Sequence, residues 1–218
     1  MTSPAAVCRS FLRCLDHSRA VQRPYPHWLF TDALPEDTAD AIAALPWPPP
    51  PASDGRGKRD THNAARTYFG VAGRAAHAVC DTVAHAFQSR ETTDAIRRTC
   101  GVDLAGTSLR IEYCQDTDGF WLEPHTDIGV KAFTMLIYLS KGPHCADWGT
   151  DLLDAAGRIV ARAPYAFNEG LIFLPGSDTW HGFAERPIAG VRKSIIVNYV
   201  SPEWRARHEL CFPDRPIA

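Results

Sequence analysis

Residues 121–130 read Trp-Leu-Glu-Pro-His-Thr-Asp-Ile-Gly-Val, and a second histidine stands further along the chain in Trp180-His181-Gly182. In an extended chain, side chains at positions i and i+2 project to the same side. We therefore expect His125 and Asp127 to bind one metal ion together. His181, at the start of a later strand, is expected to supply a third ligand. Two imidazoles and one carboxylate form a facial ligand set that leaves metal positions open.

A strand with an arginine at its start follows these residues. Residues 192–199 read Arg-Lys-Ser-Ile-Ile-Val-Asn-Tyr, a β-branched run typical of a strand. Alternation along it places Arg192, Ser194 and Ile196 on one face, and Lys193 on the other, where we expect it to be solvated. A buried guanidinium needs an anionic partner, and its fork suits a carboxylate. The interior face of this strand therefore predicts an anion site.

Short apolar or β-branched runs fill the chain after residue 104, with Gly and Pro between them. Such spacing is typical of an antiparallel sandwich or barrel. The part before residue 104 predicts helices instead, because its apolar residues recur at helical spacing. We expect one α+β domain whose helices support one face of a β-sandwich. The predicted helices are 4–19, 34–45 and 70–100, the last broken near Ser89-Arg90, and the predicted strands are 26–30, 107–113, 133–139, 149–153, 158–163, 171–174 and 191–200.

Composition excludes several classes of protein. The chain has 218 residues, 45% of them hydrophobic and 22% charged, with a formal net charge of −2. No dense Lys/Arg run and no apolar run of about 20 residues occurs, so we expect neither nucleic acid nor a membrane as partner. The seven cysteines are an odd number without C-x-x-C spacing, which predicts reduced thiols. Because Arg9 and Arg13 interrupt the first apolar stretch, we expect no signal peptide and a cytoplasmic protein.

Three segments allow more than one interpretation. The Pro- and Gly-rich residues 46–64 predict a surface loop, or a lid over an active site. His144-Cys145 and Asp147 suggest a polar loop rather than a second metal site. Residues 148–151, Trp-Gly-Thr-Asp, are equally compatible with packing and with substrate contact.

The pattern His125-x-Asp127, His181, then Arg192-x-Ser194 resembles the Fe(II)/2-oxoglutarate-dependent oxygenase superfamily, closest to its prolyl-hydroxylase-like branch. The resemblance covers roughly residues 105–205 and, more weakly, residues 26–45. It implies one domain over residues 1–218, with a double-stranded β-helix (jelly roll) core at 105–205 and mainly helical support at 1–104. It also implies that His125, Asp127 and His181 bind Fe(II), that Arg192 and Ser194 hold the distal carboxylate of 2-oxoglutarate, and that Tyr113 assists there.

By the same resemblance the protein would be a dioxygenase that consumes O2 and 2-oxoglutarate and releases succinate and CO2, with ascorbate as a stimulant. Asp127 favours hydroxylation, desaturation or cyclisation over halogenation, because halogenases of this type carry a small residue there. We expect a small-molecule substrate. The alternatives are a peptidyl or prolyl hydroxylase, a cupin-like metal enzyme without 2-oxoglutarate, which leaves Arg192 and Ser194 unexplained, and a silent binding module, against which the intact triad argues. Substrate, stereochemistry and oligomeric state stay open.

Overall fold

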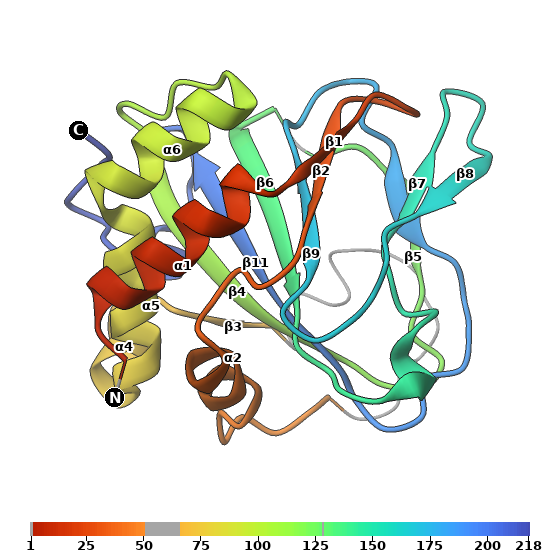
Figure 1. The fold of residues 1–218 in the computed structure, drawn as a ribbon, viewed down its shortest axis with the longest axis horizontal. Coiled ribbons are helices and arrows are strands. Elements are labelled where there is room, and N and C mark those ends of the chain that lie inside the picture. The colour runs from red at the N-terminus through yellow and green to blue at the C-terminus, as the bar shows by residue number, and fades with distance from the viewer. Residues whose placement is uncertain (1, 51–65, 128) are drawn as a thin grey trace.

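Two antiparallel β-sheets face each other, and helices cover the outer face of the larger sheet (Figure 1). The computed structural model describes residues 2–50, 66–127 and 129–218. The helices of this part are α1 (Pro4–Asp16), α2 (Glu36–Ala43), α4 (Val71–Ala76), α5 (Ala78–Gln88) and α6 (Arg90–Cys100), with short 3-10 turns at Pro143–Cys145 and Arg207–Glu209.

The larger sheet has seven strands within the described residues and the smaller has four. In spatial order, the larger sheet consists of β1 (Arg19–Val21), β2 (His27–Phe30), β9 (Gly170–Phe173), β6 (Lys131–Tyr138), β11 (Arg192–Val200), β4 (Ser108–Asp116) and β3 (Thr67–Tyr68). The smaller sheet consists of β5 (Leu122–His125), β10 (His181–Phe183), β7 (Asp151–Leu153) and β8 (Ile159–Arg162).

Capping residues fix the helix boundaries. The Ser3 side chain accepts the Ala6 N–H at the start of α1, and Ser89 accepts the Thr92 N–H at the start of α6. Gly101 ends α6 with a φ of 74°, which a glycine adopts without strain. The predicted break at Ser89 is therefore confirmed. A second break at His77, between α4 and α5, was not predicted, and α1 ends before the predicted residue 19 because β1 begins there.

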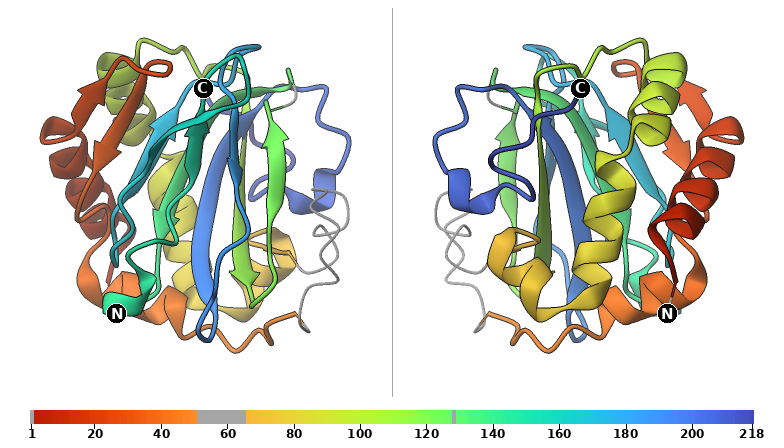
Figure 2. Two further views of the ribbon diagram at one scale, coloured as in Figure 1. Left: turned by 90° about the vertical axis from the view of Figure 1, so that its right-hand side faces the viewer. Right: turned by 90° about the vertical axis from the view of Figure 1, so that its left-hand side faces the viewer.

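Strands β4 and β11 pair along nine residues each and give the larger sheet two different faces. One face packs under the helices and forms the main core (Figure 2). It carries Leu109, Ile111, Tyr113, Ile195 and Val197. The opposite face, turned to the smaller sheet, carries mostly polar and charged side chains in register, with Ile196 among them. These cross-strand pairs are Ser194–Cys114, Ile196–Glu112, Asn198–Arg110 and Arg192–Asp116.

The smaller sheet brings two histidines together. His181 of β10 is the register partner of His125 of β5, although the segments are far apart in the sequence. Every predicted strand is present, with bounds shifted by a few residues. Strands β1, β3 and β5 were not predicted, because each is short and has little hydrophobic pattern.

The interpretation of residues 46–64 as a loop or lid falls mostly on residues 51–64, which lie outside the described residues. The described start of this segment is anchored. Trp47 packs against Phe69 and Tyr113, and the Gln115 amide donates hydrogen bonds to the carbonyls of Trp47 and Pro48.

All seven cysteines lie in the described ranges and are free and buried, which agrees with the predicted thiols. In those ranges no helix has the length and apolar character needed to cross a bilayer.

Candidate active site

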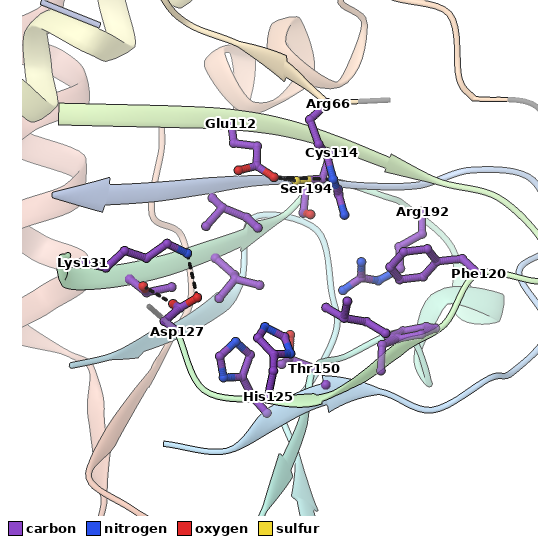
Figure 3. Close-up of a pocket in the computed structure, with 17 residues that line it drawn as sticks. Arg66, Glu112, Cys114, Phe120, His125, Asp127, Lys131, Thr150, Arg192 and Ser194 are labelled. Carbon is purple, nitrogen blue, oxygen red and sulfur yellow. Dashed lines mark hydrogen bonds and ion pairs between the residues drawn. The ribbon is translucent and has the colours of Figure 1, made fainter. Parts of the chain in front are cut away.

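A pocket lies between the polar face of the larger sheet and the smaller sheet (Figure 3). Its walls combine charged groups with apolar side chains, so a ligand there meets fixed charges in partly dry surroundings. The lining residues are Arg66, Glu112, Cys114, Phe120, Leu122, His125, Asp127, Lys131, Thr134, Leu136, Thr150, His181, Gly182, Phe183, Arg192, Ser194 and Ile196.

The three predicted metal ligands meet at one end of this pocket. One ligand atom from each of His125, Asp127 and His181 lies within 4.8 Å of the other two. This is the one group of three or more His, Cys, Asp or Glu residues among the described residues that could hold a metal ion. His144 and Asp147 are not part of such a group; His144 lies in the 3-10 turn Pro143–Cys145, and Asp147 follows it.

Both imidazoles are held in the same tautomer. Nδ1 of His125 lies 2.9 Å from the carbonyl oxygen of Glu123, and Nδ1 of His181 lies 2.9 Å from that of Thr179. A carbonyl oxygen only accepts, so each Nδ1 must carry the proton and donate. Each Nε2 then keeps its lone pair, which is the arrangement of histidine metal ligands. Burial lowers the pKa of His181 to about 4, so this imidazole is neutral near pH 7.

The Asp127 carboxylate is fixed from two sides. Lys131 Nζ lies 2.7 Å from Oδ1, with both side chains about 1% exposed, and Thr134 Oγ1 donates to Oδ2 at 2.8 Å. Asn198 in turn donates to Thr134 Oγ1 at 2.9 Å. The side chain of Asp127 is therefore oriented by the sheet behind it.

Arg192 lines the same pocket, as the alternation of β11 predicts, together with Ser194. Its Nη1 lies 2.5 Å from Asp116 Oδ2, and its Nε donates to the Trp148 carbonyl at 2.8 Å. Burial is the largest single effect and lowers the pKa of Arg192, but the Asp116 carboxylate together with Tyr165 and Tyr138 outweighs it, so that pKa is raised. Arg192 is thus a fixed cation with a buried counter-ion that the sequence did not indicate.

Lys193 lies on the opposite face of β11, as predicted. The expectation that it is simply solvated is wrong, because its Nζ donates to the Ala43 carbonyl at 2.7 Å. That carbonyl belongs to the last residue of α2, where the helix dipole favours a cation.

Tyr113 is the predicted site residue that the structure does not bring to the pocket. It belongs to the core under the helices and packs against Trp47. Successive side chains of a strand point to opposite faces, so its neighbours Glu112 and Cys114 line the pocket instead. The expectation that Tyr113 assists in holding 2-oxoglutarate is therefore corrected.

In the segment 148–151, packing is shown for Trp148, and substrate contact stays a prediction for Thr150. Trp148 is 2% exposed and packs in the second core, while Thr150 lines the pocket and binds the Tyr138 hydroxyl at 3.0 Å.

Four charged residues at or beside the pocket were missed: Arg66, Glu112, Asp116 and Lys131. A signal existed for two of them, because Arg110, Glu112 and Asp116 are charged residues at even spacing along one face of the predicted strand at 107–113 and its continuation.

No family model matches the sequence, and no curated protein matches it. Solved structures do match. A prolyl 4-hydroxylase from Phytophthora capsici is 13% identical, over 94% of this chain and 67% of that one, with a TM-score of 0.60. A prolyl hydroxylase from Trichoplax adhaerens, in complex with a hypoxia-inducible factor peptide, is 14% identical over 91% and 90% of the two chains, with a TM-score of 0.57. HygX from Streptomyces hygroscopicus, with nickel and 2-oxoglutarate bound, is 13% identical over 82% and 84%, with a TM-score of 0.51. These likenesses show a shared fold.

Proposed function

We propose that this protein is a non-haem Fe(II)- and 2-oxoglutarate-dependent dioxygenase that hydroxylates a small-molecule substrate. The observation that carries the proposal is the convergence of His125, Asp127 and His181 in the pocket that Arg192 also lines. The shared fold supports it, since HygX is described with a metal and 2-oxoglutarate bound. We further propose that residues 1–218 form one domain and that the two facing sheets are a double-stranded β-helix.

The residues present fit Fe(II). Two imidazoles with free Nε2 lone pairs and one carboxylate are the ligand set that Fe(II) takes in oxygenases of this kind, with positions left open. When bound, the iron would supply oxygen activation coupled to conversion of 2-oxoglutarate into succinate and CO2. Lys131 and Thr134 hold the Asp127 carboxylate at its place, and the backbone carbonyls of residues 123 and 179 hold the two imidazole rings.

Arg192 and Ser194 are the groups proposed to hold the distal carboxylate of 2-oxoglutarate. Because Nε and Nη1 of Arg192 are engaged by Trp148 and Asp116, its guanidinium plane is set before a ligand arrives. Its Nη2 and the Ser194 hydroxyl are the donors we assign to the carboxylate. The apolar lining excludes water from reactive groups. It consists of Phe120, Leu122, Leu136, Phe183 and Ile196.

The test combines binding and turnover. The protein should bind one Fe(II), bind 2-oxoglutarate, and release succinate when a substrate panel is added, measured by mass spectrometry. His181→Ala should abolish turnover and lower iron affinity, because a facial site cannot spare one of three protein ligands. His17→Ala, at an exposed histidine outside the pocket, is the matched control. Full turnover by His181→Ala in metal-controlled buffer would refute the proposal.

A second candidate is hydroxylation of a peptide side chain. It is favoured by the shared fold with the prolyl hydroxylase from Trichoplax adhaerens, which is described in complex with a peptide. Proline-containing peptides in the same succinate assay separate the two candidates. A cupin-like metal enzyme without 2-oxoglutarate is the weaker alternative, because it assigns no role to Arg192 and Ser194.

A further inference from the structure

Among the residues that the structure describes, three cations line the pocket: Arg66, Lys131 and Arg192. Two of them have a carboxylate within hydrogen-bonding distance. Lys131 lies 2.7 Å from Asp127, and Arg192 lies 2.5 Å from Asp116. The third cation differs from them in its surroundings.

Arg66 enters the pocket from the residue before β3, on the edge of the larger sheet. Figure 3 shows its side chain reaching inward from the side opposite His125 and Asp127. The side chain is 11% exposed. Its Nε lies 3.5 Å from Glu112 Oε1 and its Nη1 lies 3.5 Å from Asp116 Oδ1. Nη1 is buried and makes no hydrogen bond within the described part of the chain.

Each of these two carboxylates has a closer cation than Arg66. Arg110 Nη1 lies 2.5 Å from Glu112 Oε2, and Arg192 Nη1 lies 2.5 Å from Asp116 Oδ2. Glu112 and Asp116 therefore stabilise the buried charge of Arg66 but leave its Nη1 without a hydrogen-bond acceptor in the described part of the chain. A buried guanidinium with a donor left over gains when a ligand supplies the acceptor.

We propose that Arg66 binds a carboxylate of the primary substrate, and that the substrate class is a small organic acid. This inference rests on the proposed function, because 2-oxoglutarate at Arg192 is what leaves Arg66 for a second anion. The planar fork of arginine matches a carboxylate in bidentate geometry. A phosphate dianion fits less well, since Glu112 and Asp116 lie 3.5 Å from the same guanidinium and would repel the extra charge.

The test uses acetate as the probe and acetamide as its neutral isostere. Saturation-transfer difference NMR is recorded on the protein loaded with Zn(II), as a diamagnetic stand-in for iron, and saturated with 2-oxoglutarate. The wild-type acetate signal should exceed the acetamide signal. Arg66→Met should lower the acetate signal at least threefold, and Arg66→Lys should lower it less, because the charge stays and the fork is lost. Arg158→Met, at a side chain 79% exposed on the β7–β8 turn, should leave it unchanged.

Equal acetate signals in the wild type and Arg66→Met, or equal acetate and acetamide signals in the wild type, would overturn the proposal. Should Arg66→Met not fold, Arg66→Lys is judged by the same comparison. A stronger Arg66-dependent signal from trialanine than from acetate would indicate that Arg66 binds the C-terminal carboxylate of a peptide. That result would overturn the assignment of a small organic acid.

Titration of 2-oxoglutarate into the same samples separates this inference from the proposed function. Arg66→Met should bind 2-oxoglutarate like the wild type, and loss of that binding would mean that Arg66 serves the co-substrate instead. Failure of the wild type to bind 2-oxoglutarate would overturn the proposed function and this inference together, whereas normal 2-oxoglutarate binding with an acetate signal that does not depend on Arg66 would overturn this inference alone.

Discussion

Replacing Arg192 by alanine should weaken 2-oxoglutarate binding far more than replacing its neighbour Lys193. A desolvated pair between arginine and a carboxylate is worth about 2–5 kcal/mol when one partner is removed. At 1.4 kcal/mol per factor of ten, the lower limit corresponds to roughly a 30-fold loss of affinity. Iron affinity should change little, because Arg192 is not among the three metal-ligand candidates.

The structure adds a second effect of this substitution. Asp116 is 3% exposed and Arg192 is its closest cation among the described residues, so Arg192→Ala leaves a buried carboxylate whose remaining ion pair in that part of the chain is the 3.5 Å contact to Arg66. Breaking a buried ion pair from one side costs about 3–5 kcal/mol of folding free energy. The double variant Arg192→Ala/Asp116→Asn removes that charge and should recover part of the stability without recovering 2-oxoglutarate affinity. Binding and folding are thereby separated.

Lys193→Ala is the matched comparison. It removes one hydrogen bond to the Ala43 carbonyl at the end of α2, for which we expect a stability loss of about 0.3–1 kcal/mol. Its affinity for 2-oxoglutarate should change less than about threefold, since a change confined to the far face of β11 is worth well under 1 kcal/mol at the pocket. Calorimetric titration of 2-oxoglutarate, with urea unfolding of each variant, gives both quantities. Wild-type affinity for 2-oxoglutarate in a folded Arg192→Ala/Asp116→Asn protein would refute the assignment of Arg192. If Lys193→Ala lost more of this affinity than Arg192→Ala, the co-substrate would bind on the opposite face of β11.

Three further predictions concern other parts of the molecule. Thr134→Val removes the hydroxyl that donates to Asp127, so metal affinity measured by competition with a chelator should fall about 10-fold, and no change would show that the hydroxyl does not orient the carboxylate. Gly170→Ala would place a methyl group 1.9 Å from the Leu136 carbonyl oxygen, so urea unfolding should show a loss of about 1–3 kcal/mol or more, and a neutral result would contradict this close approach of β9 and β6. Burial lowers the pKa of His27, so the folded protein binds a proton at this residue less readily than the unfolded chain does. The free energy of unfolding should therefore keep this group's contribution above pH 6.5 and lose it below pH 6.5, by up to about 1.4 kcal/mol per pH unit. His27→Gln should flatten that slope in urea unfolding between pH 7 and 5, and an unchanged slope would assign it to other groups.

Strand positions and the candidate metal ligands could be predicted from the sequence because both depend on local spacing. A period of two along an extended segment places Arg192 and Ser194 together wherever the strand lies. His125 and Asp127 are also two positions apart, although β5 ends at His125, and the structure places their ligand atoms close together. What spacing does not give is which strand lies beside which. The pairing of His181 with His125 is a property of the sheet, and the sequence shows only that the two residues exist.

Tyr113 shows why the face of a strand is harder to predict than the strand. The run from residue 107 to 113 predicts a strand, and an aromatic residue in it suits either a core or a pocket. Its face is decided by the neighbours that it meets across the sheet, Ile195 on β11 and Thr67 on β3, and these lie far away in the sequence. Tyr113 packs in the core under the helices. Because neighbouring side chains of a strand point to opposite faces, Glu112 then lies on the pocket side.

The charged face of β4 explains why sequence patterns alone understated the site. Arg110, Glu112 and Asp116 are each no more than 3% exposed, although such residues are almost never fully buried without a partner. Arg110 and Glu112 pair with each other on β4, and the other partners come from distant segments: Glu209 for Arg110, Arg192 for Asp116, and the Arg66 guanidinium near both acids. Because removing one member leaves a buried charge unpaired, these pairs hold the strands in one register and hold Arg192 in one orientation. The ion-pair network that orients Arg192, the proposed co-substrate anchor, also includes Arg66. A substitution at Asp116 should therefore alter the binding of anions at both arginines, whereas a substitution at Ser194 should alter only the binding at Arg192.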